Sequence, residues 1–278
     1  MMHHDFSSCT ILRAVVGSTL HGVNNKDGLE DRDEMGVIIE PYDWALTVKE
    51  PFEQYVYRSA EERTGKSDAP SEAGDLDLTL YSLRKYLRLA LNGNPTILLL
   101  LFAPESACVH IDARGRHLQE LTPSILSKRS GKAFLGYLHA QRQRMLGERG
   151  NAGHGRPRSM LIEQYGFDTK YAMHMCRLGL QGIELLTTGQ IQLPIEESER
   201  LTLLDIRNGK WTMQQVLTFA GELESQLKDL VSTCDFPDEP EVAKVDAWMR
   251  RMYYTNWSAT QWHLDRLEAD RIHNTFHP

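Results

Sequence analysis

The sequence predicts an α+β protein, with a small mixed β-sheet in the first part of the chain and an α-helical domain after it. Short apolar runs and one stretch of polar-apolar alternation indicate strands. Beyond about Pro104 the apolar residues recur almost exclusively at helical spacing. The strands are expected at residues 11–16, 35–39 and 75–80. We therefore expect a sheet domain over residues 1–104 and a helical domain over residues 105–278 that closes the cleft between them.

The first expected strand has the sequence ILRAVV at residues 11–16 and ends in Gly17-Ser18, a pair that indicates a tight turn. A polar, glycine-bearing loop at residues 24–30 separates it from the second strand. Residues 59–74 lack apolar periodicity and are rich in small and charged side chains. We expect this segment to be a mobile, disordered insertion on the surface.

The third expected strand, DLDLTL, alternates with period two, which is typical of a strand with one buried face. From Leu83 the apolar residues follow helical spacing instead, and Asn92-Gly93-Asn94-Pro95 ends that helix because Pro cannot continue it. Further helices are expected near residues 118–126, 131–146, 159–164, 169–188, 212–231 and 241–268.

The charge balance excludes a protein that coats nucleic acid through overall basicity, because the net charge is -7. The charge is distributed unevenly, however. Residues 128–158 contain a single acid, Glu148, and the basic residues Lys128, Arg129, Lys132, Arg142, Arg144, Arg149, Arg156 and Arg158. Two interpretations stay open for this segment: a flexible polyanion-binding surface, or a solvated loop and helix.

Several features predict a cytoplasmic location. Residues 1–10 lack the cationic stretch and apolar block of a secretory signal, and no run of about 18 apolar residues offers a membrane span. The cysteines form no CxxC pair, so neither a zinc knuckle nor a redox dithiol is indicated. Their wide spacing fits reduced thiols; they are Cys9, Cys108, Cys176 and Cys234.

Aspartates on the expected second and third strands form the candidate catalytic and metal site. Side chains alternate along a strand, so Asp31 and Asp33 project on one side, about 7 Å apart. Asp77 on the third strand is the preferred third carboxylate, although Asp75 shares its face. Carboxylates so placed can share two Mg²⁺ ions, which supply the electrostatic positioning that phosphoryl transfer requires.

Gly17 and Ser18 supply the expected phosphate-binding part of the same site. A residue without a Cβ lets backbone amides approach phosphate oxygens, and the serine hydroxyl adds a donor. Neither the Gly-Ser pair nor Asp-x-Asp is specific alone. Their order, with strand, Gly-Ser, Asp-x-Asp, strand and a later strand-borne aspartate, is the order of a nucleotidyltransferase fold.

The residues also resemble a known family, the RNA repair pathway DNA polymerase beta family of polymerase-beta-like nucleotidyltransferases. The resemblance rests on VVGSTLHGV followed by DRDEMGVII, on DLTLYSLRKYLRLALNGNPTILLLLF and on FDTKYAMHMCRLGLQGIELLTTGQIQLP. It implies a palm-like catalytic domain and identifies Asp77 as the third carboxylate, with Tyr81 as the tyrosine of a D-x-x-x-Y strand. Arg32 departs from the usual apolar residue, so either that strand edge is exposed or Arg32 meets phosphate.

The resemblance further implies an NTP substrate, two Mg²⁺ ions with Mn²⁺ as an alternative, and an RNA acceptor such as a tRNA 3′ end. Transfer to a protein or small-molecule hydroxyl, and a non-catalytic nucleotide sensor, are the rival interpretations. The sequence is compatible with a homo-oligomer.

The expected helix at residues 169–188 carries one further candidate binding surface. Lys170, His174 and Arg177, together with Gln181, fall in a narrow stripe nearly opposite the apolar face. The stripe is either a solvated surface or a nucleotide-binding face that points into the cleft.

Overall fold

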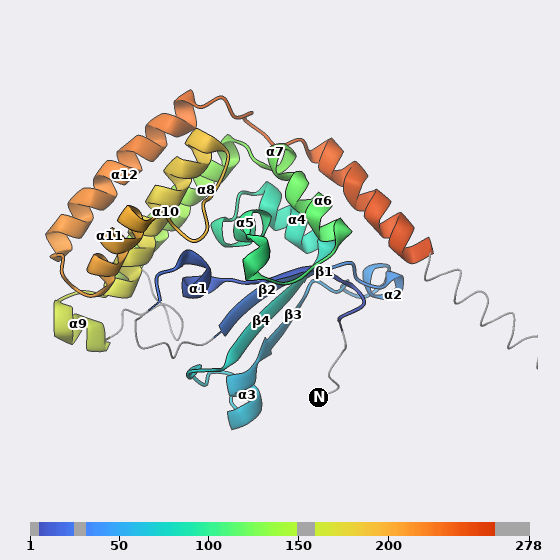
Figure 1. Cartoon of the computed structure of the whole chain (residues 1–278), viewed down its shortest axis with the longest axis horizontal. Coiled ribbons are helices and arrows are strands. Elements are labelled where there is room, and N and C mark those ends of the chain that lie inside the picture. The colour runs from blue at the N-terminus through green and yellow to red at the C-terminus, as the bar shows by residue number, and fades with distance from the viewer. Residues whose placement is uncertain (1–5, 25–31, 149–158, 259–278) are drawn as a thin grey trace, which may run out of the picture.

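The computed structural model describes residues 6–24, 32–148 and 159–258, and its core is a five-stranded mixed sheet with helices packed on it (Figure 1). The α+β prediction is confirmed. The sheet order is β3-β4-β2-β1-β5. The strands are β1 (Thr10–Val15), β2 (Arg32–Ile38), β3 (Gln54–Arg58), β4 (Leu76–Ser82) and β5 (Cys108–Ile111).

The two central strands β2 and β4 run parallel, whereas the other pairs are antiparallel. The edge strands β3 and β5 were not predicted from the sequence. In both strands the side chains show little alternation between buried and exposed positions, because an edge strand is exposed along much of its length. Strand β5 also lies past the boundary predicted at residue 104, so the sheet takes one strand from the region that we expected to be helical.

One face of the sheet is covered by α4 (Leu83–Leu91), α5 (Pro95–Phe102) and α6 (Ala113–Glu120) (Figure 1). Helix α4 starts and ends as predicted: Ser82 caps it by accepting from the Lys85 amide, and Asn92 follows it. The apolar helix α5, begun by Asn94 and Pro95, was not predicted; nearly all of its side chains are buried, so it shows no amphipathic pattern.

The expectation of a disordered segment over residues 59–74 is wrong for its first part, which forms α3 (Ser59–Thr64). Ala60 is fully buried. The loop that follows is held by Arg58, whose guanidinium donates to the carbonyls of Ser67 and Ala69, each at 2.9 Å. Side-chain to backbone bonds of this kind order a segment without leaving any periodicity in the sequence.

The helical part is built around α10, whose bounds Thr169–Thr188 are those predicted. This helix packs between α8 (Lys128–Met145) and α12 (Met213–Thr233) (Figure 1). Gly179 and Gly182 permit this close packing, since a Cβ at Gly179 would come within 2.8 Å of Leu223 and one at Gly182 within 3.0 Å of Leu227. The other elements outside the sheet are α1 (Gly17–His21), α2 (Tyr42–Ala45), η1 (Glu105–Ala107), α7 (Thr122–Ile125), α9 (Ser159–Tyr165) and α11 (Glu197–Arg207).

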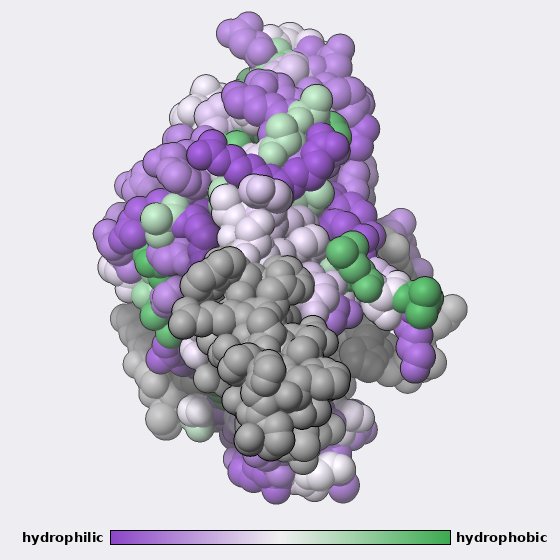
Figure 2. All heavy atoms as spheres, turned by 90° about the vertical axis from the view of Figure 1, so that its right-hand side faces the viewer, coloured by the Kyte–Doolittle hydropathy of each residue, from purple (hydrophilic) through white to green (hydrophobic). Residues whose placement is uncertain are grey.

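A last helix over residues 242–258 returns to the sheet domain. The Tyr253 hydroxyl donates to the buried Glu40 carboxylate at 2.8 Å, and the Trp257 indole donates to the Glu40 carbonyl at 2.9 Å. Seen from the side on which this helix lies, the surface is mostly hydrophilic with scattered apolar side chains (Figure 2). No helix among the described residues is long and apolar enough to cross a membrane.

Candidate active site

Asp33 and Asp77 lie side by side on the two central strands. They are register partners in the parallel β2–β4 pair, so their Cα atoms are separated by roughly the 4.8 Å spacing of adjacent strands and their side chains leave the same face. Arg58 on β3 is in turn the register partner of Asp77. A row of one arginine and two aspartates therefore crosses three neighbouring strands.

Gly17 lies directly against the Asp33 carboxylate. Its φ is +69°, and a Cβ at this position would stand 2.3 Å from Asp33 Oδ2. The amide of Val16 also donates to the Asp33 carbonyl at 2.9 Å. The Gly-Ser segment, predicted as a turn, is the first turn of α1, and only glycine leaves room there for the carboxylate.

Asp75 and Asp77 have different surroundings, which separates the two candidates for the third carboxylate. Asp75 accepts from the Glu72 amide at 2.8 Å, from Ser59 Oγ at 2.7 Å and from Arg63 Nη2 at 2.9 Å. These hydrogen bonds, the one from the Glu72 backbone first, lower the pKa of Asp75 to about 2. Asp75 is therefore engaged in holding the loop after α3.

Asp77 keeps acceptor capacity on the face that it shares with Asp33. Its Oδ2 accepts from Ser71 Oγ at 2.9 Å and lies 3.5 Å from Arg58 Nε. Its Oδ1 is buried and accepts no hydrogen bond from the described residues, but it lies 3.4 Å from Arg58 Nε, so Asp77 forms an ion pair with Arg58. A buried carboxylate oxygen that accepts no hydrogen bond is unusual in proteins and keeps capacity for a further cation.

Arg32 and Tyr81 are placed by strand alternation. Arg32 leaves the opposite face of β2 from Asp33, its side chain is 55% exposed, and its Nε donates to Glu34 at 2.5 Å. The interpretation that the strand is exposed at the position of Arg32 thus fits the structure. Tyr81 shares the face of Asp77 and packs, partly buried, against the main hydrophobic core.

A cavity of about 590 Å³ lies between the sheet and the helices, and it gathers most of the predicted site. Gly17, Ser18 and Asp33 line it from the sheet side, and Lys170, His174 and Arg177 line it from α10. Asp77 lies next to Asp33 but outside the lining, and Asp31 lies outside the described residues. The remaining lining residues are His21, Val23, Ser71, Glu72, Ala73, Thr96, Leu99, Tyr137, Gln141, Arg144, Met173, Leu178 and Arg207.

Comparison with protein families gives the decisive finding. A sequence model of the RNA repair pathway DNA polymerase beta family matches residues 2–251. The chain belongs to this family. It is accordingly a polymerase-beta-like nucleotidyltransferase, as the resemblance of its Gly-Ser and Asp-x-Asp segments implied. A comparison with curated proteins finds no match.

Two solved structures of related fold are similar to this nucleotidyltransferase at low sequence identity. One is the spectinomycin adenyltransferase AAD(9) from Enterococcus faecialis with ATP and spectinomycin, at 15% identity and a TM-score of 0.39, covering 80% of this chain and 93% of that one. The other is a nucleotidyltransferase-like protein from Exiguobacterium sibiricum, at 10% identity and a TM-score of 0.29, covering 81% and 70%.

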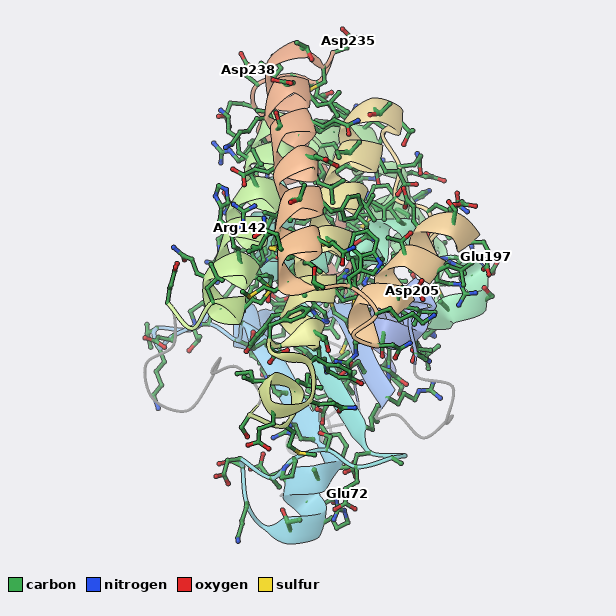
Figure 3. The ribbon with its side chains drawn as sticks, turned by 90° about the vertical axis from the view of Figure 1, so that its left-hand side faces the viewer. Glu72, Arg142, Glu197, Asp205, Asp235 and Asp238 are labelled. Atoms are coloured by element: carbon green, nitrogen blue, oxygen red, sulfur yellow. The ribbon has the colours of Figure 1, made fainter. Side chains whose placement is uncertain are left out.

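The helical wall of the nucleotidyltransferase cavity contains two further arginines, one from the predicted basic segment and one that the sequence analysis did not single out. Arg144 on α8 and Arg207 at the end of α11 join Lys170 and Arg177 in the lining, against the acids Asp33 and Glu72. Figure 3 shows Glu72 beside α3, at the end of the sheet domain that lies away from the bundle carrying Arg142. Arg207 belongs to α11, a helix that was not predicted, so no sequence signal pointed to it.

The predicted α10 stripe faces this cavity. Burial lowers the pKa of Arg177 to about 10, which leaves its guanidinium charged at neutral pH. Arg177 Nη1 lies 2.5 Å from Nε2 of His21, a buried histidine of α1 that sequence reasoning missed. The solvated-surface interpretation of the stripe therefore fails for Arg177, which a residue of the other domain contacts.

Some cations of the basic segment at residues 128–158 form ion pairs with acidic residues outside the segment. Lys128 pairs with Asp238 at 3.1 Å, Arg129 pairs with Glu239, and Arg142 pairs with Glu224 at 2.8 Å. In Figure 3 Arg142 lies on α8 beside α12, the helix that carries Glu224. Arg144, in contrast, lines the cavity. The remaining arginines of the segment, Arg149, Arg156 and Arg158, lie outside the described residues.

The described residues provide only part of the oxygen ligands that a divalent metal site needs. No group of three or more His, Cys, Asp or Glu side chains there is close enough to hold a metal ion. The pair of Asp33 and Asp77, in which Asp77 Oδ1 accepts no hydrogen bond from the described residues, provides the hard oxygen ligands that Mg²⁺ prefers. Asp31, two residues before Asp33 in the sequence, is the third expected ligand.

Proposed function

We propose that this nucleotidyltransferase moves a nucleoside monophosphate from an NTP to the 3′ hydroxyl of an RNA, with tRNA as the leading acceptor. The acceptor oxygen attacks the α-phosphorus, the bond from that phosphorus to the bridging oxygen breaks, and pyrophosphate leaves. The observation that carries the proposal is the register pair Asp33–Asp77 beside a cavity lined by Lys170, Arg177, Arg144 and Arg207.

The aspartates are the proposed catalytic and metal-binding residues. Asp31, Asp33 and Asp77 would hold two Mg²⁺ ions, or Mn²⁺ in their place; when bound, such ions neutralise phosphate charge and align the attacking and leaving oxygens. Asp77 also accepts or directs the proton of the acceptor hydroxyl. Its buried Oδ1, which accepts no hydrogen bond from the described residues, supports both roles.

Phosphate binding falls to the two walls of the cavity. Gly17 and Ser18 on the sheet side offer backbone and hydroxyl donors where a side chain at residue 17 would collide with Asp33. Lys170, His174 and Arg177 on α10 face the same space. Opposed donors of this kind suit a polyphosphate bound between the domains.

The charge of the lining supports an anionic acceptor. After Asp33 is assigned to metal, Glu72 is the one acidic side chain left among the described lining residues. A polycationic acceptor such as an aminoglycoside would need several carboxylates, whereas RNA gains from Arg144 and Arg207. This reasoning ranks RNA above a cationic small molecule, and a protein hydroxyl or a nucleotide sensor remain outcomes of the test.

The direct test supplies each of the four NTPs, labelled at the α-phosphate, with Mg²⁺ and one acceptor at a time: total RNA, purified tRNA, a cell protein extract or an aminoglycoside panel. We expect label on RNA, lost after its 3′ end is oxidised with periodate. The matched control is the Asp77→Asn variant, which keeps the shape of the side chain. Label on protein or on an aminoglycoside alone would contradict the RNA proposal, and the absence of pyrophosphate release with every acceptor would favour a sensor.

We also place the reaction in the cytoplasm. All four cysteines are free thiols in the structure, and burial raises the pKa of Cys176 to about 12. Such a thiol is unreactive and fits a reducing compartment.

A further inference from the structure

A buried histidine links the glycine turn of the sheet domain to the cationic face of α10. His21 is the last residue of α1, four residues after Gly17, and its side chain is 2% exposed. Its ring approaches Arg177 and Gln181 of α10, both more than 150 residues away in sequence. The contact therefore joins the two walls of the cavity.

The chemistry of the contact determines the state of the imidazole. A guanidinium can only donate, so His21 Nε2, at 2.5 Å from Arg177 Nη1, is the acceptor in this contact, while Nδ1 lies 3.3 Å from Gln181 Nε2. Arg177 Nη1 donates also to Gln181 Oε1 at 3.0 Å. Burial, together with the charges of Arg177 and His174, lowers the pKa of His21 well below its ordinary value. The ring thus stays neutral and keeps its acceptor at physiological pH.

Both acceptors that hold Arg177 are neutral. Among the described residues no carboxylate pairs with its guanidinium, although burial makes an uncompensated charge costly. A carboxylate in place of His21 would also fix the side chain, but it would cancel the charge that an anion needs. A neutral acceptor fixes the position of the guanidinium and leaves its full charge for a ligand in the cavity.

We infer that His21 is a positioning residue, whose Nε2 holds the Arg177 guanidinium in the cavity for contact with the polyphosphate of the substrate. The inference rests on the proposed function for the identity of the polyphosphate as part of an NTP. It gives His21 a task that no carboxylate and no apolar side chain can perform.

Two variants separate positioning from packing. His21→Phe fills the space without an acceptor, and His21→Gln keeps an acceptor at similar reach. With inorganic tripolyphosphate as the probe in titration calorimetry, we expect His21→Phe to weaken binding about tenfold, the effect of one lost charge-assisted hydrogen bond. His21→Gln should stay within about threefold of the wild type, and Arg177→Met should lose at least as much as His21→Phe.

The double variant His21→Phe/Arg177→Met completes the test. Its affinity should equal that of Arg177→Met alone, because His21 acts through Arg177. Additive losses, wild-type binding by His21→Phe, or no binding of tripolyphosphate by the wild type would each overturn the inference. If Phe prevents folding, as judged by thermal unfolding, His21→Leu removes the acceptor with a smaller side chain.

The binding assay is independent of the transfer reaction. Wild-type protein that binds tripolyphosphate through His21 and Arg177 but labels no acceptor would leave this inference intact and defeat the proposed transferase function. Labelling of RNA by a fully active His21→Phe variant would support the transferase function and overturn this inference.

Discussion

Asp33 on β2 and Asp77 on β4 are register partners across a parallel strand pair, although they are 44 positions apart in the sequence. Pairing in register places their side chains on one face, and it continues along the rest of β2 and β4. The relationship brings the Asp-x-Asp strand and the later aspartate-bearing strand to one place on the sheet. It also indicates where the structure is most sensitive to substitution.

Removing either carboxylate should abolish turnover without unfolding the protein. For Asp33→Asn and Asp77→Asn we expect nucleotide transfer to fall by at least about 100-fold, since losing a direct metal ligand costs more than losing a residue that supports one. Transfer rates and thermal midpoints, measured on the same preparations, check this. Wild-type rates in either variant would contradict the assignment.

Gly17→Ala tests the close approach to Asp33. The substitution meets a positive φ and a clash with Asp33 Oδ2, so we expect a loss of stability of about 1–3 kcal/mol and a large loss of activity. Gly147→Ala is the control, because Gly147 has a φ of +75° with nothing within 4 Å of the added Cβ. Urea unfolding and transfer assays should show a stability cost in both variants and an activity loss in Gly17→Ala alone.

The loop carboxylate Asp75 should contribute stability that depends on pH. Its folded pKa, about 2, lies below the ordinary value of 3.8, so its contribution is fully present above about pH 4 and is lost as the pH falls toward 2. Asp75→Asn should therefore destabilise the protein at pH 6, and the difference from the wild type should shrink at pH 3. Unfolding curves at both pH values measure it; a difference independent of pH would refute the linkage.

The structure separates Arg144 from its basic neighbours. Arg144→Gln should weaken RNA binding and reduce the slope of log affinity against log salt by about one, because Arg144 lines the cavity. Arg129→Gln should leave RNA binding unchanged, since Arg129 pairs with Glu239, and should alter stability by less than about 1 kcal/mol. Filter binding across a salt series compares the two, and equal effects would favour a diffuse basic surface.

Tyr253→Phe tests the contact that fastens the last helix to the sheet domain. The variant leaves the buried Glu40 carboxylate without its hydroxyl donor, which should cost about 1–3 kcal/mol at neutral pH. Burial raises the pKa of Glu40, so the carboxyl protonates more readily in the fold and the cost should decrease as the pH falls toward 5. Tyr254→Phe is the control because Tyr254 is 74% exposed; equal midpoints for the two variants would refute the role of Tyr253.

Local patterns in the sequence were enough for the elements that are periodic in themselves. The half-buried strand that carries Asp77, the amphipathic helix from Leu83 and the bounds of α10 follow from alternation or helical spacing. The Gly-Ser pair and the Asp-x-Asp segment, with the family motifs, were enough to predict a turn after the first strand and the class of enzyme. The strand and the helices depend on neighbours within a few residues, so the sequence alone determined them.

Tertiary structure decided what depends on distant partners. The edge strands β3 and β5 exist only because β4 and β1 offer unpaired backbone groups. Asp75 differs from Asp77 because Ser59 and Arg63 meet one of them, and Arg129 differs from Arg144 because Glu239 comes back to it from beyond α12. The physical reason is the same throughout: hydrogen bonds and ion pairs are made between groups that packing brings together, and no local pattern records which groups those will be.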